Sequence, residues 1–293
     1  VGISGDYAFV GARREDTGGT DRGSVYIYVR SGTTWTQQAQ IQASDAQDSD
    51  SFGWALSVDG DYAIVGAYLE DTGGSNAGSA YIFYRSGTTW SQQAKIQASD
   101  KQADDRFGVS VDIKGEYAIV GADSEDTGGT DAGAAYIFKR TGTTWSQQSK
   151  LTASDAQADD KFGGYEQCVA ITSDYAVVGA NQEDAGGSNA GAAYVFSRSG
   201  STWTEVKKLT ASDTSTNDKF GMSTAIDGNT ILIGAYNEST HGTNAGAAYI
   251  YTSQQVTNYY ITDAGKYSVD ATIAGLNYKT NEVEVTGSIT PVK

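Results

Sequence analysis

The stretch FGVSVDIKGEYAIVGADSEDTGGTDAGAAYIF, at Phe107–Phe138, decides the fold. It contains an alternating segment (FGVSVDI), a turn (KGEY), a continuous apolar run (YAIVGA), a long loop rich in Gly and Asp, and a further apolar run (AAYIF). Period-2 alternation and aromatic or β-branched residues, set between Gly, Asp and Ser clusters, predict short strands joined by turns. No segment shows a sustained helical period, so we expect an all-β protein.

This unit recurs along the chain. Gly-Ala pairs begin at positions 11, 66, 121, 179 and 234, in steps of 55, 55, 58 and 55 residues. Phe-Gly pairs at 52, 107, 162 and 220 keep the same period, as do Trp35, Trp90, Trp145 and Trp203. One insertion of three residues lies near Gly163–Cys168. Five copies of one unit indicate a repeat architecture.

Each unit predicts four antiparallel strands. The fourth, WSQQSKLTAS in the third unit, is the most polar, and an acidic loop follows it. A four-stranded sheet of this kind is typical of a β-propeller blade. A β-solenoid or a stack of sheets is the alternative, but solenoid coils are usually shorter. We expect Gly121, Ala134 and Ala135 to let neighbouring blades approach closely, and the tryptophan that begins strand four to pack between blades.

Composition excludes several classes of function. The 293 residues carry a net charge of −16, which would repel nucleic acid and anionic membranes. The content of 39% hydrophobic and 11% aromatic residues predicts a packed core rather than disorder. No apolar run is long enough for a membrane helix. Because residue 1 is Val and the first unit lacks its Phe-Gly, we expect a processed chain or a part of a longer protein.

The sequence shows no catalytic constellation. Cys168 is the only cysteine, so we expect a small buried residue and no intramolecular disulfide. The only histidine, His241, lies in a glycine-rich loop of another unit. Paired carboxylates such as Asp104-Asp105 recur between units, which is typical of solvation or scaffold. We therefore expect no enzyme activity, and one His with one Cys argues against zinc.

The motifs Phe107-Gly108, Gly121-Ala122 and Gly133–Tyr136 resemble the FG-GAP repeat, the unit of the integrin α-subunit head. Segments such as GTTWSQQAKIQASD and EDTGG are closer to a variant found in large surface proteins of marine microbes and algae. The resemblance extends over Val1–Tyr251. It implies a β-propeller, most often of seven blades, and an extracellular role in adhesion or assembly. Five units could close a small ring, or belong to a larger one.

The chain departs from the integrin-type pattern at two places. Pro follows Gly-Ala there, whereas Arg13, Tyr68, Asp123, Asn181 or Tyr236 follows it here. The integrin-type calcium loop, Asp-x-Asp-x-Asp-Gly in form, is replaced by the turns SGDY, DGDY, KGEY, TSDY and DGNT. These turns are too short to supply the roughly six to eight oxygen ligands that calcium takes.

Acidic side chains concentrate in two other loops of each unit. In an up-and-down blade the loop between strands two and three and the loop to the next unit share one side, so we expect a ring of carboxylates there. Such a ring could bind calcium through oxygen ligands; the alternative is that Asp caps turns through the local backbone. The metal candidates are Asp16, Asp71, Asp126, Asp184, Asp105 and Asp160, and the ring also includes Asp50, Asp104, Asp159 and Asp218. The fifth copy has Ser239 and His241 in place of Asp and Gly, and a metal site there would be empty.

We divide the chain into a propeller, residues 1–255, and a C-terminal β segment, residues 256–293. NYYIT, at Asn258–Thr262, could supply the fourth strand of the fifth unit. Asp263–Tyr267 resembles the tyrosine-corner segment of immunoglobulin-like domains; a strand pair on the propeller, or an arm reaching a neighbouring subunit, is the alternative. Asn237 begins an N-glycosylation sequon.

These features predict a non-enzymatic, extracellular adhesion or structural module of a larger cell-surface or appendage protein. Its partners would be other extracellular proteins, copies of itself, or glycans. The alternative is a lectin or glycan-processing propeller with a pocket near the axis. The two differ in where the non-repeating residues lie: clustering at the axis favours a binding site, and scattering over the outer strands favours assembly. The Gly163–Cys168 insertion and the His241 loop are the candidates for such a site.

Overall fold

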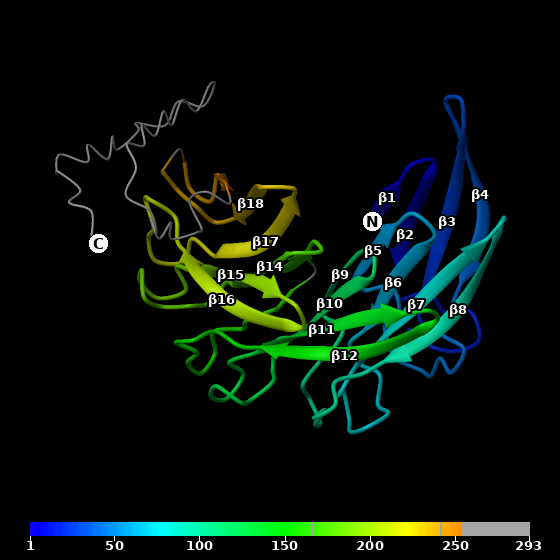
Figure 1. Cartoon of the computed structure of the whole chain (residues 1–293), viewed down its shortest axis with the longest axis horizontal. Helices are drawn as coiled ribbons and strands as arrows, with labels where there is room; N and C mark the ends of the chain where they lie inside the picture. Colours follow the sequence, from blue (N-terminus) through cyan, green and yellow to red (C-terminus); the bar gives the residue numbers. More distant parts are fainter. Residues whose placement is uncertain (166, 241, 253–293) are drawn as a thin grey trace, which may run out of the picture. The chain divides into compact units, whose positions relative to one another are not determined.

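A computed structural model describes residues 1–165, 167–240 and 242–252, and these fold into antiparallel β-sheets (Figure 1). Five sheets follow one another along the chain, four of them with four strands and the last with three within the described residues. The prediction of an all-β propeller built from five repeats is confirmed. The expectations for Asn258–Thr262, the tyrosine-corner segment and His241 lie outside the described residues.

The strands of the described residues are, in chain order, β1 (Gly2–Ser4), β2 (Tyr7–Ala12), β3 (Ser24–Ser31), β4 (Thr34–Ile41), β5 (Leu56–Asp59), β6 (Tyr62–Ala67), β7 (Ser79–Ser86), β8 (Thr89–Ile96), β9 (Ser110–Lys114), β10 (Tyr117–Ala122), β11 (Ala134–Thr141), β12 (Thr144–Leu151), β13 (Val169–Ile171), β14 (Tyr175–Ala180), β15 (Ala192–Ser199), β16 (Thr202–Leu209), β17 (Phe220–Asp227), β18 (Thr230–Ala235) and β19 (Ala247–Thr252).

Within each blade the strands pair in sequence order, as in the order β5-β6-β7-β8 of the second blade. The first strands of successive blades, β1, β5, β9, β13 and β17, contact one another in series. Residues from all five of these inner strands line one cavity of about 310 Å³. The first strand of each blade therefore lies at the axis of the propeller, and the fourth strand forms its outer edge.

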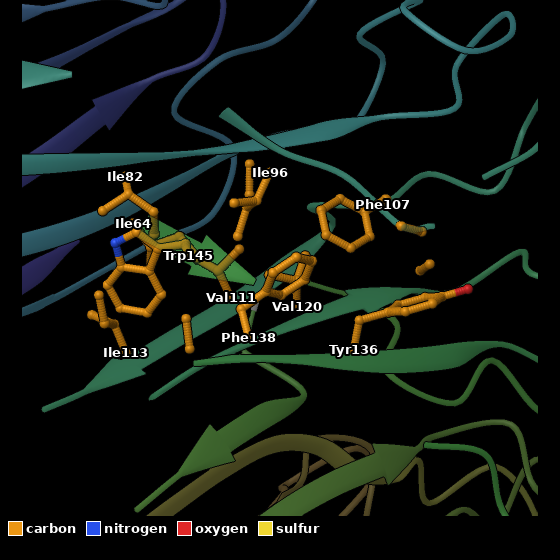
Figure 2. Packing of buried hydrophobic residues seen from close by; sticks show 14 of the residues in the cluster. Ile64, Ile82, Ile96, Phe107, Val111, Ile113, Val120, Tyr136, Phe138 and Trp145 are labelled. Atoms are coloured by element: carbon orange, nitrogen blue, oxygen red, sulfur yellow. The ribbon is translucent and has the colours of Figure 1, made fainter. Parts of the chain in front are cut away.

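The hydrophobic core lies between blades. Figure 2 shows the layer between the second and third blades, where Ile64, Ile82 and Ile96 face Phe138 and Trp145. Trp145 is only 8% exposed, and its indole Nε1 donates to Oε1 of Gln93 in the preceding blade at 3.0 Å. Gln93 is free to reach forward because it is the extra residue of a β-bulge in β8. The prediction that the strand-four tryptophan packs between blades is confirmed.

Glycine sets how closely the blades approach. A Cβ added at Gly121 would lie 1.9 Å from the carbonyl oxygen of Gly163, which precedes the next blade. No side chain fits in that space, because the neighbour is backbone and cannot rotate away. The expected close approach at the Gly-Ala pair is thus confirmed. Cys168, also predicted to be buried, is fully enclosed, and its Sγ lies 3.2 Å from the carbonyl oxygen of Gly221.

We expect Trp145→Ala to lower the free energy of unfolding by about 3–5 kcal/mol, because it empties a large space in a buried interface. The homologous Trp35 is 40% exposed in the first blade, so Trp35→Ala should cost less than about 1 kcal/mol. Urea denaturation of both variants measures the difference. Equal losses would show that Trp145 is not an interblade wedge.

Candidate functional site

The two acidic loops of each repeat lie against one another, as the topology predicts. The backbone N–H of Asp104, in the loop to the third blade, donates to the carbonyl oxygen of Ser75 at 2.7 Å. The same bond joins Asp159 to Thr130 in the next repeat at 2.9 Å. One side of the propeller therefore carries both sets of acidic loops.

The metal candidates in the loops between strands two and three each hold the conformation of their own loop. In each copy the carboxylate Oδ1 accepts the backbone N–H of the residue five positions later, at 2.6–2.8 Å. The donor residues have positive φ values between 50° and 56°, which Asp and Asn tolerate better than other residues. The four pairs are Asp16 with Asp21, Asp71 with Asn76, Asp126 with Asp131, and Asp184 with Asn189.

The fifth copy of the loop distinguishes between turn capping and calcium binding as the role of these carboxylates. Ser239 stands where the other copies have Asp, and its Oγ accepts the backbone N–H of Asn244 at 3.0 Å. The turn bond is kept although the negative charge is lost. This conservation of the bond, rather than of the charge, supports turn capping.

The second set of candidates does not form a surface ring. Asp105 is 3% exposed, and its Oδ2 accepts the backbone N–H of Gln102 at 2.6 Å. Asp160 is equally buried and accepts from Gln157 at 2.8 Å. Asp50 and Asp218 are buried in the same way, so the expected ring is wrong for these members because the loop folds over each of them.

Burial raises the pKa of Asp105 to about 6, and the carboxylates of Glu125, Asp100 and Asp126 add to the shift by repulsion. Asp50 has its pKa raised to about 6, again mainly by burial. In both residues the bond from a backbone N–H acts in the opposite direction. Burial inside the loop therefore disfavours the charged form of these carboxyl groups.

A buried glutamate that the sequence interpretation passed over organises the acidic loop of the second, third and fourth repeats. Glu125 is 2% exposed, and its Oε1 accepts from the Lys150 ammonium at 2.8 Å. Lys150 also contacts Oδ2 of Asp100, in the loop after the preceding blade, at 2.7 Å. The equivalent triads are Lys95 with Glu70 and Asp45, and Lys208 with Glu183 and Asp155. A signal was available: Glu begins every copy of the motif, including Glu238 of the fifth.

Asp112 is a second buried carboxylate that sequence reasoning missed. It lies on β9 beside the axial cavity, where the other blades have Gly, Ser or Ala. Its Oδ1 accepts from Ser57 Oγ of the second blade at 2.7 Å, and its Oδ2 accepts from Ile171 N of the fourth at 2.8 Å. Burial raises its pKa to about 6, while these bonds counteract the rise. Asp112 thus joins three inner strands.

The residues in which the repeats differ gather beside the axial cavity. The guanidinium of Arg13 lies 4.1 Å from the ring centre of Trp54, and the rings of Trp54 and Tyr68 are 4.6 Å apart. Trp54, Tyr165, Gln167 and Met222 line a cavity of about 360 Å³. Gln167 also lines the axial cavity, so the two are adjacent. Met222 also lines a neighbouring cavity together with Tyr236. We call this surface the variable rim; it comprises Arg13, Trp54, Tyr68, Tyr165, Met222 and Tyr236.

Two of the rim tyrosines reach solvent. Tyr165 is 38% exposed and Tyr236 is 54% exposed. Tyr165 and Gln167 belong to the Gly163–Cys168 insertion. This candidate from the sequence therefore lies beside the axial cavity. Asp123 and Asn181, which occupy the same repeat position as Tyr68, are buried and do not contribute exposed surface. Burial raises the pKa of Asp123, while the charges of Lys161 and Arg106 lower it.

A sequence profile described as FG-GAP repeat matches residues 1–28, 35–83, 90–138, 145–196 and 203–251. The chain belongs to the FG-GAP repeat family. FG-GAP repeats typically occur in extracellular proteins, and FG-GAP propellers are generally non-enzymatic. No curated protein matches this chain. None of the described elements is a helix that could span a membrane.

The carboxylates of the described FG-GAP loops are engaged within their own loops. Across residues 1–165, 167–240 and 242–252, no three His, Cys, Asp or Glu side chains are grouped so as to hold a metal ion. The carboxylates of both candidate sets are directed to backbone N–H groups of their own loops. Asn237, the glycosylation candidate, lies in the loop between β18 and β19, and its modification stays a prediction.

We expect the melting temperature to be the same in EDTA and in millimolar calcium, because the loop carboxylates cap turns. A ligand that binds only the folded state would raise it. The melting temperature of the Asp126→Asn variant should likewise be the same in EDTA and in calcium. A calcium-dependent rise that Asp126→Asn abolishes would instead establish a calcium site in these loops.

Asp105 and Asp100 should affect the pH dependence of stability in opposite directions. Because the folded-state pKa of Asp105, about 6, lies above the unfolded value of about 3.9, stability falls as pH rises through about 6. Asp105→Asn should therefore raise the melting temperature at pH 7.5 by roughly 2–4 °C, and by less at pH 4.5.

Asp100→Asn is the matched control with the opposite sign. Burial raises the pKa of Asp100, but the hydrogen bond and the positive charge of Lys150 act against burial, and the pKa is lowered overall. Its contribution to stability is present at neutral pH and is lost as pH falls, so Asp100→Asn should lower the melting temperature at pH 7.5. Thermal melts at the two pH values measure both effects. The same sign for both variants would contradict this assignment.

Proposed function

We propose that this protein is a non-enzymatic recognition module of an extracellular or cell-surface protein, and that it contacts its partner through the variable rim. The observation that carries the proposal is the clustering of non-repeating side chains beside the axial cavity. Residues that repeat build the blades, whereas the rim positions after Gly-Ala and after Phe-Gly vary from one repeat to another. Such a division supports a scaffold that presents one distinctive surface.

The composition of the rim suits contact with another extracellular protein in adhesion or in the assembly of a larger structure. Trp, Tyr and Arg are the residues most enriched at the energetic centres of protein interfaces. Trp54 is already packed against both Tyr68 and Arg13, so little side-chain entropy would be lost on binding. The net charge of −16 favours a partner with a basic surface.

Glycan binding is the second candidate, and the same clustering favours it over assembly through the outer strands. Aromatic faces beside a shallow cavity can stack on sugar rings, and Gln167 offers hydrogen-bonding groups at the edge of that cavity.

The test is binding of the labelled full chain to the surface of intact cells that produce it. We expect saturable binding, and the double variant Tyr165→Ser/Tyr236→Ser should weaken it at least about tenfold because hot-spot aromatics dominate affinity. Tyr84→Ser is the matched control, since Tyr84 is also 38% exposed but lies on β7 of the second blade and is not part of the variable rim.

Pretreatment of the cells distinguishes the two candidates. Loss of binding after protease treatment, with no effect of glycosidase, supports a protein partner. Loss after glycosidase, or competition by a simple sugar, moves the assignment to glycan binding. Absence of binding, or equal loss in the Tyr84→Ser control, would overturn the role of the rim.

A further inference from the structure

One position of the inner strands breaks the repeat beside the axis. The equivalent residues of the five blades are Gly2, Ser57, Asp112, Ala170 and Ala225, and all of them line the axial cavity of about 310 Å³. Four of these residues are small and uncharged, so they leave the centre of the propeller open. The third blade alone places a carboxylate there, although the other blades form the same strand without one.

The Asp112 carboxylate is held by neutral donors. Its Oδ1 accepts from Ser57 Oγ at 2.7 Å and from the backbone N–H of Ile113 at 2.9 Å. Its Oδ2 accepts from the backbone N–H of Ile171 at 2.8 Å. A carboxylate offers about four acceptor sites, so these three bonds leave one site on Oδ2 for a further donor.

No lysine or arginine in the described part of the chain forms an ion pair with Asp112. Lys114, on the same strand, pairs with Asp59 at 2.9 Å instead. The buried carboxylate of Glu125, by contrast, contacts the ammonium group of Lys150 at 2.8 Å. The inner strands enclose Asp112, and it keeps partial exposure where it faces the cavity. An enclosed anion without a counterion is unfavourable, so a cation bound in the cavity would be stabilised.

The remaining walls of the cavity decide which cation fits. They are largely aliphatic, and include Ile3, Leu56, Val58, Val111, Val169 and Ile226. Calcium takes about six to eight oxygen ligands, which one carboxylate among aliphatic side chains does not supply. A protonated amine on a short alkyl chain matches both features, because its ammonium group can donate to Oδ2 while its methylene groups leave water.

We propose that the axial cavity binds a small protonated aliphatic amine, whose ammonium group pairs with Asp112 and whose alkyl chain lies against the aliphatic walls. Burial raises the pKa of Asp112 to about 6, so the carboxylate is mostly charged at pH 7.5. None of the residues of the variable rim lines this cavity, although Gln167 lines both it and the adjoining one. The proposal therefore does not rest on the proposed function.

The experiment titrates the full chain with n-butylammonium chloride at pH 7.5 and follows alanine and isoleucine methyl groups by NMR. We expect saturable shifts at Ala170, Ala225 and Ile226, with a Kd of about 1 mM, well within the limit for so small a ligand. From methylammonium to n-butylammonium, affinity should rise roughly fourfold per methylene group buried. n-Butanol, which has the same chain and no charge, should bind at least about tenfold more weakly.

Two variants test the two parts of the site. Asp112→Asn keeps the size of the side chain, removes its charge, and should weaken n-butylammonium binding at least about tenfold. Asp105→Asn is the matched control, because Asp105 is a buried aspartate whose pKa is also about 6 and which does not line the cavity; it should bind like the parent. Ala225→Phe should weaken binding as strongly with Asp112 intact, because Ala225 is exposed at the cavity and the ring would fill it.

The rim variant Tyr165→Ser/Tyr236→Ser should bind n-butylammonium like the parent, which distinguishes failure at this site from failure of the rim. The comparison with n-butanol and the Ala225→Phe variant keep the test valid if Asp112→Asn does not fold. Equal affinity for n-butanol and n-butylammonium, or equal binding by the parent and Asp112→Asn, would overturn the proposal. Absence of saturable shifts up to about 10 mM would also overturn it.

Discussion

The close contact of backbone with backbone between successive blades is the constraint on which the rest of this propeller depends. At the third junction the carbonyl oxygen of Gly163 occupies the space that a side chain at Gly121 would need. This contact sets the separation of the sheets, and the separation determines which side chains fill the layer between them. Trp145 and Phe138 pack against Ile64 and Ile82 only because the blades approach this closely (Figure 2).

The acidic character of the chain has two physical origins. Exposed carboxylates such as Asp126 cap loops in which a non-glycine residue has positive φ. Buried carboxylates such as Glu125 belong to a triad with a lysine of the same blade and an aspartate from the loop before it. A buried carboxylate needs such partners, since an unpaired charge would lose its hydration without compensation. Most of the acidic motif therefore serves the loops, which explains why it repeats with the blades.

The repeat also separates folding from recognition. Positions that build the junctions are the same in every blade, so they cannot distinguish one partner from another. The positions after Gly-Ala and the insertion before Cys168 differ from blade to blade, and their exposed members meet in the variable rim. Recognition thus falls to the residues that the fold leaves unconstrained, which is common where loops are held by a rigid scaffold.

The sequence by itself determined the strands, their order in each blade, the five repeats and the positions of Gly121 and Trp145 between blades. These features follow from local alternation, from turn residues and from a period of 55 residues, all of which are properties of neighbouring positions. Tertiary structure alone decided that Asp105 and Asp160 are buried, that Lys150 joins Glu125 to Asp100, and that Arg13, Trp54 and Tyr68 stack. Each of these depends on how one blade or loop folds onto another, a distance that no spacing along the chain specifies.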